Sequence, residues 1–325
     1  VASGKTLTAT ANPVNVSEDA TISGPASGTA ATLVANEINL KKDKTLAIDG
    51  IVNLSSSVTF TGSGKLKIAN GGTLTIGGTP TLPENITIEN GGTLNLTGNV
   101  TLVNNITIEE GGTLNLSGEH IYFANEDLSK TANITGAGTI KFSKNGTANV
   151  HRLTSCIEGI TATYQYNQRV TYDNTCTRII PGTYYSLTID KAEMPLCGDV
   201  TVNNQFSPAQ DMTLSCEEGR NPTLTVGNIN YNNANRNLTF NVNTTITDNT
   251  NYQNRISAIT VAEGKKVTFI GNTNINTNVT LAGDIEIAEG ATLNLGGEHT
   301  YFATDDLLTQ KANIIEIGRA SCRER

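Results

Sequence analysis

The sequence lacks tryptophan and has few charged side chains, which make up 16% of its 325 residues. No stretch approaches the roughly 18 continuous apolar residues of a membrane-spanning helix, so we expect none in this chain. Acidic residues outnumber basic ones by 30 to 22, and no basic run occurs. These features exclude the positive surface of a nucleic-acid-binding protein and disfavour binding to anionic membranes.

Sustained helical periodicity is also missing, whereas Thr, Asn and Gly are abundant. Thr favours strands, and Asn and Gly favour tight turns. Short apolar runs in which every second residue is apolar recur between these turns. The composition therefore predicts an all-β protein with many short strands.

The two ends of the chain bear on its origin. Residues 317–325 read IGRASCRER, which matches the translation of a common sequencing adapter. We therefore expect a non-native tail at 317–325 and a native segment at 1–316. Because the chain also begins with Val1 rather than Met, we interpret it as a metagenomic fragment of a longer gene.

Four windows of the sequence align without gaps at intervals of about 20 residues. They read LAIDGIVNL, LKIANGGTL, ITIENGGTL and ITIEEGGTL. Each window and the residues after it contain three short runs with alternating apolar residues, which predicts three strands per coil. The columns expected to point inward are Leu46/Leu66/Ile86/Ile106, Ile48/Ile68/Ile88/Ile108, Leu54/Leu74/Leu94/Leu114, Ile76/Leu96/Leu116 and Leu82/Leu102/Tyr122.

Glycine-containing turns separate these strands. Asn-Gly-Gly begins at Asn70 and again at Asn90, and a single Gly follows the second strand at Gly78, Gly98 and Gly118. Asn-Gly supplies the positive φ that a sharp corner requires. Coils stacked about 4.8 Å apart would pair every strand with its neighbours and bury the aliphatic columns. The sequence thus predicts a parallel β-helix, or solenoid, of about 15 coils.

A longer repeat overlies the coils. Residues 99–124 and 278–303 match at a constant offset of about 180 residues, and both contain the sequence GEH-x-YFA. This offset corresponds to a module of about nine coils. We expect regular coils at about 40–140 and 257–316 and less regular coils at about 141–256, in one continuous solenoid over 1–316.

A distinctive segment at 170–190 reads VTYDNTCTRIIPGTYYSLTID. It resembles a recurring stretch of large secreted, adhesin-like surface proteins of Bacteroidota, which leads into pectate-lyase-like β-helix coils. The match is best over Pro181–Ile189, whereas Cys176 stands where a small residue is usual. The resemblance implies a right-handed parallel β-helix and a location outside the cell or on its surface.

Four cysteines recur at coil spacing. Cys156, Cys176, Cys197 and Cys216 follow one another at intervals of about 20 residues. Equivalent Cα atoms in adjacent coils lie within the range that a disulfide spans, so one interpretation pairs Cys156 with Cys176 and Cys197 with Cys216. The alternative is four buried thiols that act as small apolar residues. No CxxC or paired His accompanies them, so a metal site is not expected.

The GEH-x-YFA sequence places Glu, His and Tyr together in both copies of the long repeat. In a functional interpretation, the aromatic ring stacks on a sugar beside Glu and His. In the structural interpretation, which we favour, Tyr122 and His120 belong to inward columns of a regular coil. The candidates for weak ligand binding are Glu119, His120, Tyr122, Glu298, His299 and Tyr301.

Two further types of site have less support. The acidic pairs Glu126-Asp127 and Asp305-Asp306 carry oxygen ligands suited to Ca²⁺. Polysaccharide-cleaving β-helix enzymes need converging carboxylates, alone or with a basic residue such as Arg152, Arg169 or Arg178. The regular coils show no such pattern, so no catalytic residue and no cofactor are predicted.

We therefore expect a non-catalytic, extracellular repeat segment of a structural or adhesin-like protein. Its partners would be a glycan or a cell-surface protein of a host. The main alternative is a β-helix polysaccharide lyase or glycoside hydrolase. A more remote alternative is an ice-binding face formed by the outward column Thr73, Thr93 and Thr113.

Overall fold

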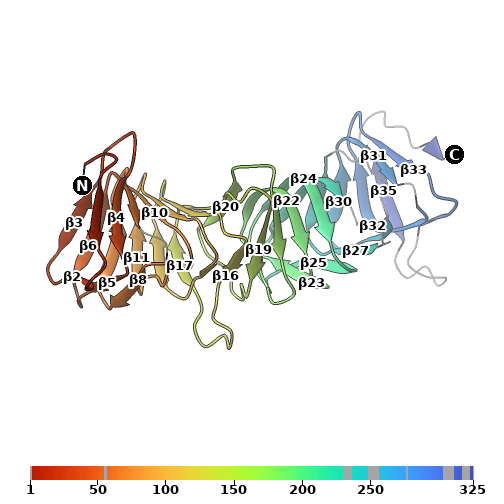
Figure 1. Ribbon diagram of the computed structural model, residues 1–325. Helices are drawn as coiled ribbons and strands as arrows, with labels where there is room; N and C mark the ends of the chain where they lie inside the picture. Colours follow the sequence, from red (N-terminus) through yellow and green to blue (C-terminus); the bar gives the residue numbers. More distant parts are fainter. Residues whose placement is uncertain are drawn as a thin grey trace. The chain divides into compact units, whose positions relative to one another are not determined.

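A computed structural model shows that the chain is an all-β solenoid. Its strands pair in parallel and form about 13 turns of about 21 residues each, which confirms the predicted fold class. The contacts divide the chain into two compact units, Val1–Gln168 and Arg169–Arg325 (Figure 1). No helix occurs in the residues that the structure describes, which are 2–54, 57–229, 236–247, 256–275, 277–302, 311–316 and 323–324.

The first unit has three faces, and most coils contribute one strand to each face. The first face contains β3 (Ala20–Ser23), β6 (Thr45–Asp49), β9 (Lys65–Ile68), β11 (Asn85–Ile88), β14 (Asn105–Ile108) and β17 (Asn133–Gly136). The second contains β1 (Thr6–Ala9), β4 (Ala31–Ala35), β7 (Ile51–Leu54), β10 (Thr73–Ile76), β12 (Thr93–Leu96), β15 (Thr113–Leu116), β18 (Thr139–Phe142) and β20 (Thr161–Tyr164). The third contains β2 (Val14–Val16), β5 (Glu37–Leu40), β8 (Thr59–Gly62), β13 (Val100–Thr101), β16 (His120–Tyr122) and β19 (Thr147–His151).

The second unit continues the same construction with longer strands that extend from one face to the next. One continuous series of paired strands contains β21 (Arg169–Tyr172), β22 (Gly182–Ile189), β24 (Val200–Pro208), β26 (Thr223–Ile229), β28 (Asn243–Ile246), β30 (Lys266–Phe269), β32 (Val279–Ile287) and β35 (Ala312–Glu316). The remaining strands are β23 (Glu193–Leu196), β25 (Met212–Cys216), β27 (Arg236–Phe240), β29 (Ile256–Val261), β31 (Asn272–Ile275), β33 (Thr292–Leu295), β34 (Thr300–Tyr301) and β36 (Arg323–Glu324). Register shifts at Tyr184/Ser186 and Val202/Gln205 interrupt its ladders.

Aliphatic side chains stack in columns inside the first unit. Leu46, Leu66, Ile86 and Ile106 pair in consecutive coils, and each is at most 2% exposed. Full burial of such a side chain contributes roughly 1.5–3 kcal/mol. The predicted columns that start at Leu46 and Ile48 are therefore confirmed, and their burial is the main stabilising term of the unit.

One predicted column has the wrong register. Leu54 pairs with Ile76, whereas Val52 pairs with Leu74. The corner before β7 consists of Gly50 alone, with a φ of 75°, whereas the next coil has the longer Asn-Gly-Gly corner. The shorter corner moves Leu54 two positions along the ladder relative to the predicted alignment. Coil length therefore varies with the length of its corners.

The long repeat is visible in the strand register. Val100 pairs with Ile121 in the first unit, and Val279 pairs with Thr300 in the second. Val279 and Thr300 are displaced from Val100 and Ile121 by the same offset that relates the two copies of the sequence repeat. The two copies therefore adopt the same local pairing, as the sequence repeat predicts.

Candidate functional site

Strand pairing on the third face of the first unit is interrupted at one coil. Thr81 bridges to Thr59 in the preceding coil, and the next strand, β13, pairs onward with β16. Pro80 and Pro83 lie on either side of Thr81 and have no backbone N–H to donate. The local sequence TPTLPE thus replaces a regular strand with an irregular segment at this position.

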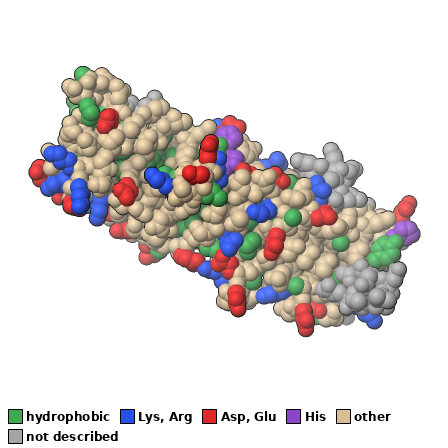
Figure 2. All heavy atoms as spheres, turned by 90° about the horizontal axis from the view of Figure 1, so that it is seen from below, with side chains coloured by type: hydrophobic (Ala, Val, Ile, Leu, Met, Phe, Trp, Pro, Cys, Tyr) green, Lys and Arg blue, Asp and Glu red, His purple; other side chains and the backbone are tan. Residues whose placement is uncertain are grey.

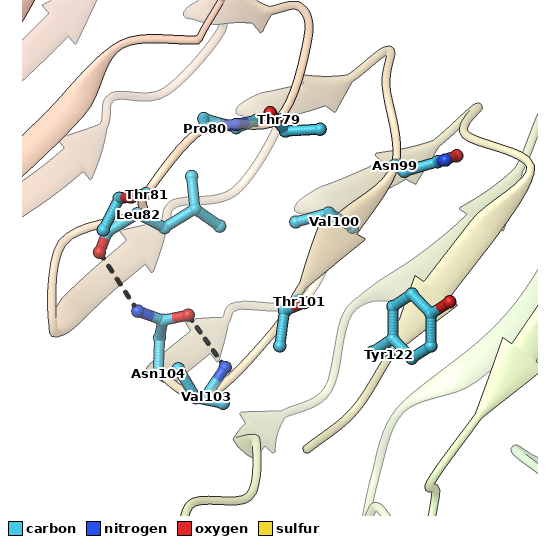
Figure 3. Close-up of a pocket in the computed structure, with 10 residues that line it drawn as sticks. All are labelled: Thr79, Pro80, Thr81, Leu82, Asn99, Val100, Thr101, Val103, Asn104 and Tyr122. Atoms are coloured by element: carbon cyan, nitrogen blue, oxygen red, sulfur yellow. Dashed lines mark hydrogen bonds between the residues drawn. The ribbon is translucent and has the colours of Figure 1, made fainter. Parts of the chain in front are cut away.

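A groove lies at this interruption (Figure 3). Its volume is about 400 Å³, which is in the range of small-molecule sites. Leu82 and Val100 contribute apolar surface, Thr79 and Asn99 contribute polar groups, and Tyr122 forms one wall.

Asn104 holds the irregular segment in place. Its buried side-chain Nδ2 donates to the carbonyl oxygens of Leu82 at 3.3 Å and Pro83 at 2.9 Å. Its Oδ1 accepts from the backbone N–H of Val103 at 3.0 Å. These three bonds replace part of the missing ladder, because buried backbone groups need partners.

The Tyr122 ring is packed against the His151 ring and the Arg152 guanidinium. The His151 ring lies 4.5 Å from the Tyr122 ring between centroids, with an interplanar angle of 18°. The guanidinium carbon of Arg152 lies 4.8 Å from the Tyr122 centroid, a cation–π distance. Both residues come from the following coil, whereas Thr101 of the preceding coil pairs with Tyr122 on the groove side. The stack therefore fixes the Tyr122 ring as one wall of the groove.

The expected inward orientation of Tyr122 and His120 is wrong. Tyr122 and His120 are half-buried on the outer surface, while Ile121 and Phe123 are buried, at 0% and 2% exposure. The coil from Val100 to Ile121 is one residue longer than the sequence windows predict. A one-residue shift moves every side chain of a strand to the other face, so the polar ends of Tyr122 and His120 point outward.

Glu119, His120 and Tyr122 are brought together as the sequence suggests. The Asn99 Oδ1 accepts from the backbone N–H groups of Glu119 and His120 at 3.0 and 2.9 Å. One carboxylate oxygen of Glu119 lies 3.8 Å from Nε2 of His120. His151 and Arg152 complete the cluster. His151 was not predicted, and Arg152 was named only as a basic residue for the enzyme alternative.

The second copy of the motif forms a smaller cluster. The His299 and Tyr301 rings lie 6.2 Å apart between centroids, and the Tyr301 side chain is 55% exposed. The Asn278 Oδ1 accepts from the backbone N–H of His299 at 2.9 Å, as Asn99 does for His120. Figure 2 shows acidic side chains beside the histidine side chains at both copies of the motif. Glu298 belongs to the same motif and directly precedes His299.

The cysteines do not form the two predicted pairs. Cys156 and Cys197 are disulfide-bonded, whereas Cys176 and Cys216 are thiols. Cys216 pairs in register with Leu196 rather than with Cys197. The Cys176 thiol donates to Asp173 Oδ1 at 3.6 Å in a local turn.

Two of the other predicted charged residues, Asp127 and Arg178, have local structural roles. Asp127 Oδ1 accepts from the hydroxyl and the backbone N–H of Ser129 at 2.6 and 3.0 Å, which lowers the pKa of its carboxyl. Asp305-Asp306 lies outside the described residues, and the described part of the chain contains no group of three or more metal-ligating side chains. Arg178 and Arg220 both bind the Glu217 carboxylate, at 2.8 and 3.2 Å.

The outward threonine column is longer than predicted. Thr73, Thr93 and Thr113 pair in register, and Thr139 and Thr161 continue the same column. The adjacent outward column contains Thr75, Asn95 and Asn115, with amide hydrogen bonds of 3.2 and 2.9 Å between neighbours. These bonds run along the unit and tie successive coils together.

Comparison of the chain with protein-family models, curated proteins and solved structures finds no match. No helix long and apolar enough to cross a membrane is present in the described residues.

Proposed function

We propose that this chain is a non-catalytic, adhesin-like repeat segment of a secreted or cell-surface protein and that it binds glycans at the Tyr122 groove. The observation that carries the proposal is the groove itself, with an ordered tyrosine wall next to amide and hydroxyl groups. Sugar rings present apolar C–H faces and a polar rim, so they are suited to an aromatic wall flanked by hydrogen-bonding groups.

The repeat architecture supports a role in display. Each coil of the first unit adds one layer of buried aliphatic residues and one set of outward polar ladders. A solenoid of this kind presents long faces and accommodates local variation in single coils. The groove arises from such a variation, because only one coil carries the Pro80 and Pro83 pair.

A location outside the cell is supported by the disulfide-bonded cysteines as well as by the resemblance of segment 170–190. Cys156 and Cys197 are disulfide-bonded, and structural disulfides are formed and kept in oxidising compartments. The resemblance to surface proteins of Bacteroidota leads to the same proposal.

A glycan array screened with the wild-type chain and with Tyr122→Ala tests the binding. We expect one class of glycans to bind the wild type, and binding to be roughly tenfold weaker in the variant, or about 1.4 kcal/mol. Tyr301→Ala is the matched control, because Tyr301 occupies the same motif position and lines no described groove. Equal binding by wild type and Tyr122→Ala would contradict the proposed site.

A reducing-end release assay on the glycans that bind separates display from cleavage. A non-catalytic segment leaves the number of reducing ends unchanged. Release of sugar ends would overturn the non-catalytic proposal and favour the alternative of a polysaccharide lyase or glycoside hydrolase.

A further inference from the structure

His120 and His151 are neighbours on adjacent coils of the first unit. Nδ1 of His120 lies 3.0 Å from Nε2 of His151, and their ring centroids are 5.3 Å apart. Both rings are half-buried on the outer surface. Strand pairing sets this distance, because β16 and β19 are in register with Tyr122 opposite His151.

We propose that His120 and His151 form a two-histidine binding site for a divalent transition metal of the Ni²⁺, Cu²⁺ or Zn²⁺ class. Imidazole is the side chain best suited to these ions. This proposal does not depend on glycan binding, because neither histidine is among the residues that line the groove.

The separation of the two nitrogens fits chelation. Metal–nitrogen bonds to histidine are about 2.0–2.1 Å long. Two such bonds at a right angle place the nitrogens about 2.9 Å apart, close to the 3.0 Å between His120 and His151. The ion would lie to one side of the line between the two nitrogens, and each ring would turn to aim a lone pair at it, so the ion would replace the present contact between the rings. Water would fill the remaining coordination positions.

Glu119 supplies an outer partner for the site. Its carboxylate lies 3.8 Å from Nε2 of His120, the nitrogen that faces away from His151. A carboxylate in this place favours the tautomer with the proton on Nε2, which leaves Nδ1 free to bind the ion. Arg152 adds a positive charge near the stack, and the Glu119 charge offsets it.

The second copy of the motif provides a control within the same chain. His299 has the same Glu before it and the same Tyr two residues after it. The chain contains only three histidines, so no further imidazole can stand beside His299 as His151 stands beside His120. A site that needs two imidazoles therefore exists in the first unit and not in the second.

Calorimetric titration of the untagged chain with Ni²⁺ tests the proposal. We expect one site that is at least tenfold weaker in His120→Asn and in His151→Asn. Glu119→Gln is expected to weaken binding by about tenfold, as is usual when the partner of a ligating histidine is lost. The His299→Asn variant is expected to bind as the wild type does.

A spectroscopic experiment on the wild type keeps the test valid if a variant fails to fold. Substoichiometric Ni²⁺ should broaden the imidazole NMR signals of His120 and His151 together and leave those of His299 sharp. Broadening of only one of the two, or wild-type affinity in folded His151→Asn, would overturn the two-histidine site. Equal loss of affinity in His299→Asn would do the same.

Discussion

The hydroxyl oxygens of Tyr172 and Tyr184 lie 2.7 Å apart inside the second unit. The Tyr184 hydroxyl lies 2.6 Å from the Ile180 carbonyl oxygen, to which it donates, and the Ile180 backbone N–H donates to the Tyr172 oxygen at 3.3 Å. Both tyrosines are fully buried. The pair thus replaces backbone pairing where the chain turns through Ile180 and Pro181 between β21 and β22.

Loss of one hydroxyl from this pair should destabilise the protein. Tyr184→Phe leaves the Ile180 carbonyl without its donor, and we expect the free energy of unfolding to fall by about 1–3 kcal/mol. Urea unfolding measures the change. Tyr301→Phe removes an exposed hydroxyl from the same unit and should change stability by less than about 0.5 kcal/mol. Equal effects would argue against the buried network.

The same pair predicts a loss of stability at alkaline pH. Burial raises the pKa of Tyr172 and of Tyr184 above the ordinary tyrosine value. The unfolded chain therefore releases these protons above about pH 10 while the folded chain retains them, so stability falls as the pH rises past that value. Thermal melts at increasing pH measure the slope. Tyr172→Phe should flatten it, and an unchanged slope would contradict the shift.

Gly98 is expected to be intolerant of any side chain. A Cβ at this position would overlap the carbonyl oxygen of Gly78 in the coil below. Gly98→Ala should therefore lower the free energy of unfolding by more than about 2 kcal/mol. Gly71→Ala is a useful comparison, because Gly71 has a φ of 71° and open space around it. Backbone strain alone should cost about 1–2 kcal/mol there.

Loss of the Asn104 side chain, which holds the irregular segment beside the groove, should destabilise the first unit. Asn104→Ala removes the partners of Leu82, Pro83 and Val103, and we expect it to destabilise the first unit by about 2–4 kcal/mol. Asn105→Ala, which removes an exposed amide from the neighbouring ladder, should cost less than about 1 kcal/mol. Differential scanning calorimetry of the two variants checks the difference.

The cysteines should differ in reactivity. Alkylation followed by mass spectrometry should label Cys216 without reduction, because its thiol is half-exposed. Cys156 and Cys197 should react only after a reductant is added, and reduction should destabilise the protein by about 2–5 kcal/mol. Labelling of Cys156 in the unreduced protein would contradict the disulfide assignment.

The coil and its core were predictable from the sequence because they depend on local patterns. Alternating aliphatic residues separated by Asn-Gly-Gly and Gly corners can bury their apolar face only by stacking on a similar coil. Equal spacing of consecutive windows then aligns residues such as Leu66 and Ile86 directly, as the strand register confirms. For the same reason, the two copies of the long repeat have equivalent strand pairing, with Val100 opposite Ile121 and Val279 opposite Thr300.

The site depended on features that only the tertiary structure decides. One additional residue between Val100 and Ile121 turns Tyr122 outward, and no local pattern shows which corner accommodates it. His151 and Arg152 reach Tyr122 only because β19 stacks on β16, although a whole coil of sequence separates them from it. The sequence alone therefore determined the solenoid, while its exact register determined which side chains meet, because a shift of one residue exchanges the inner and outer faces of a strand.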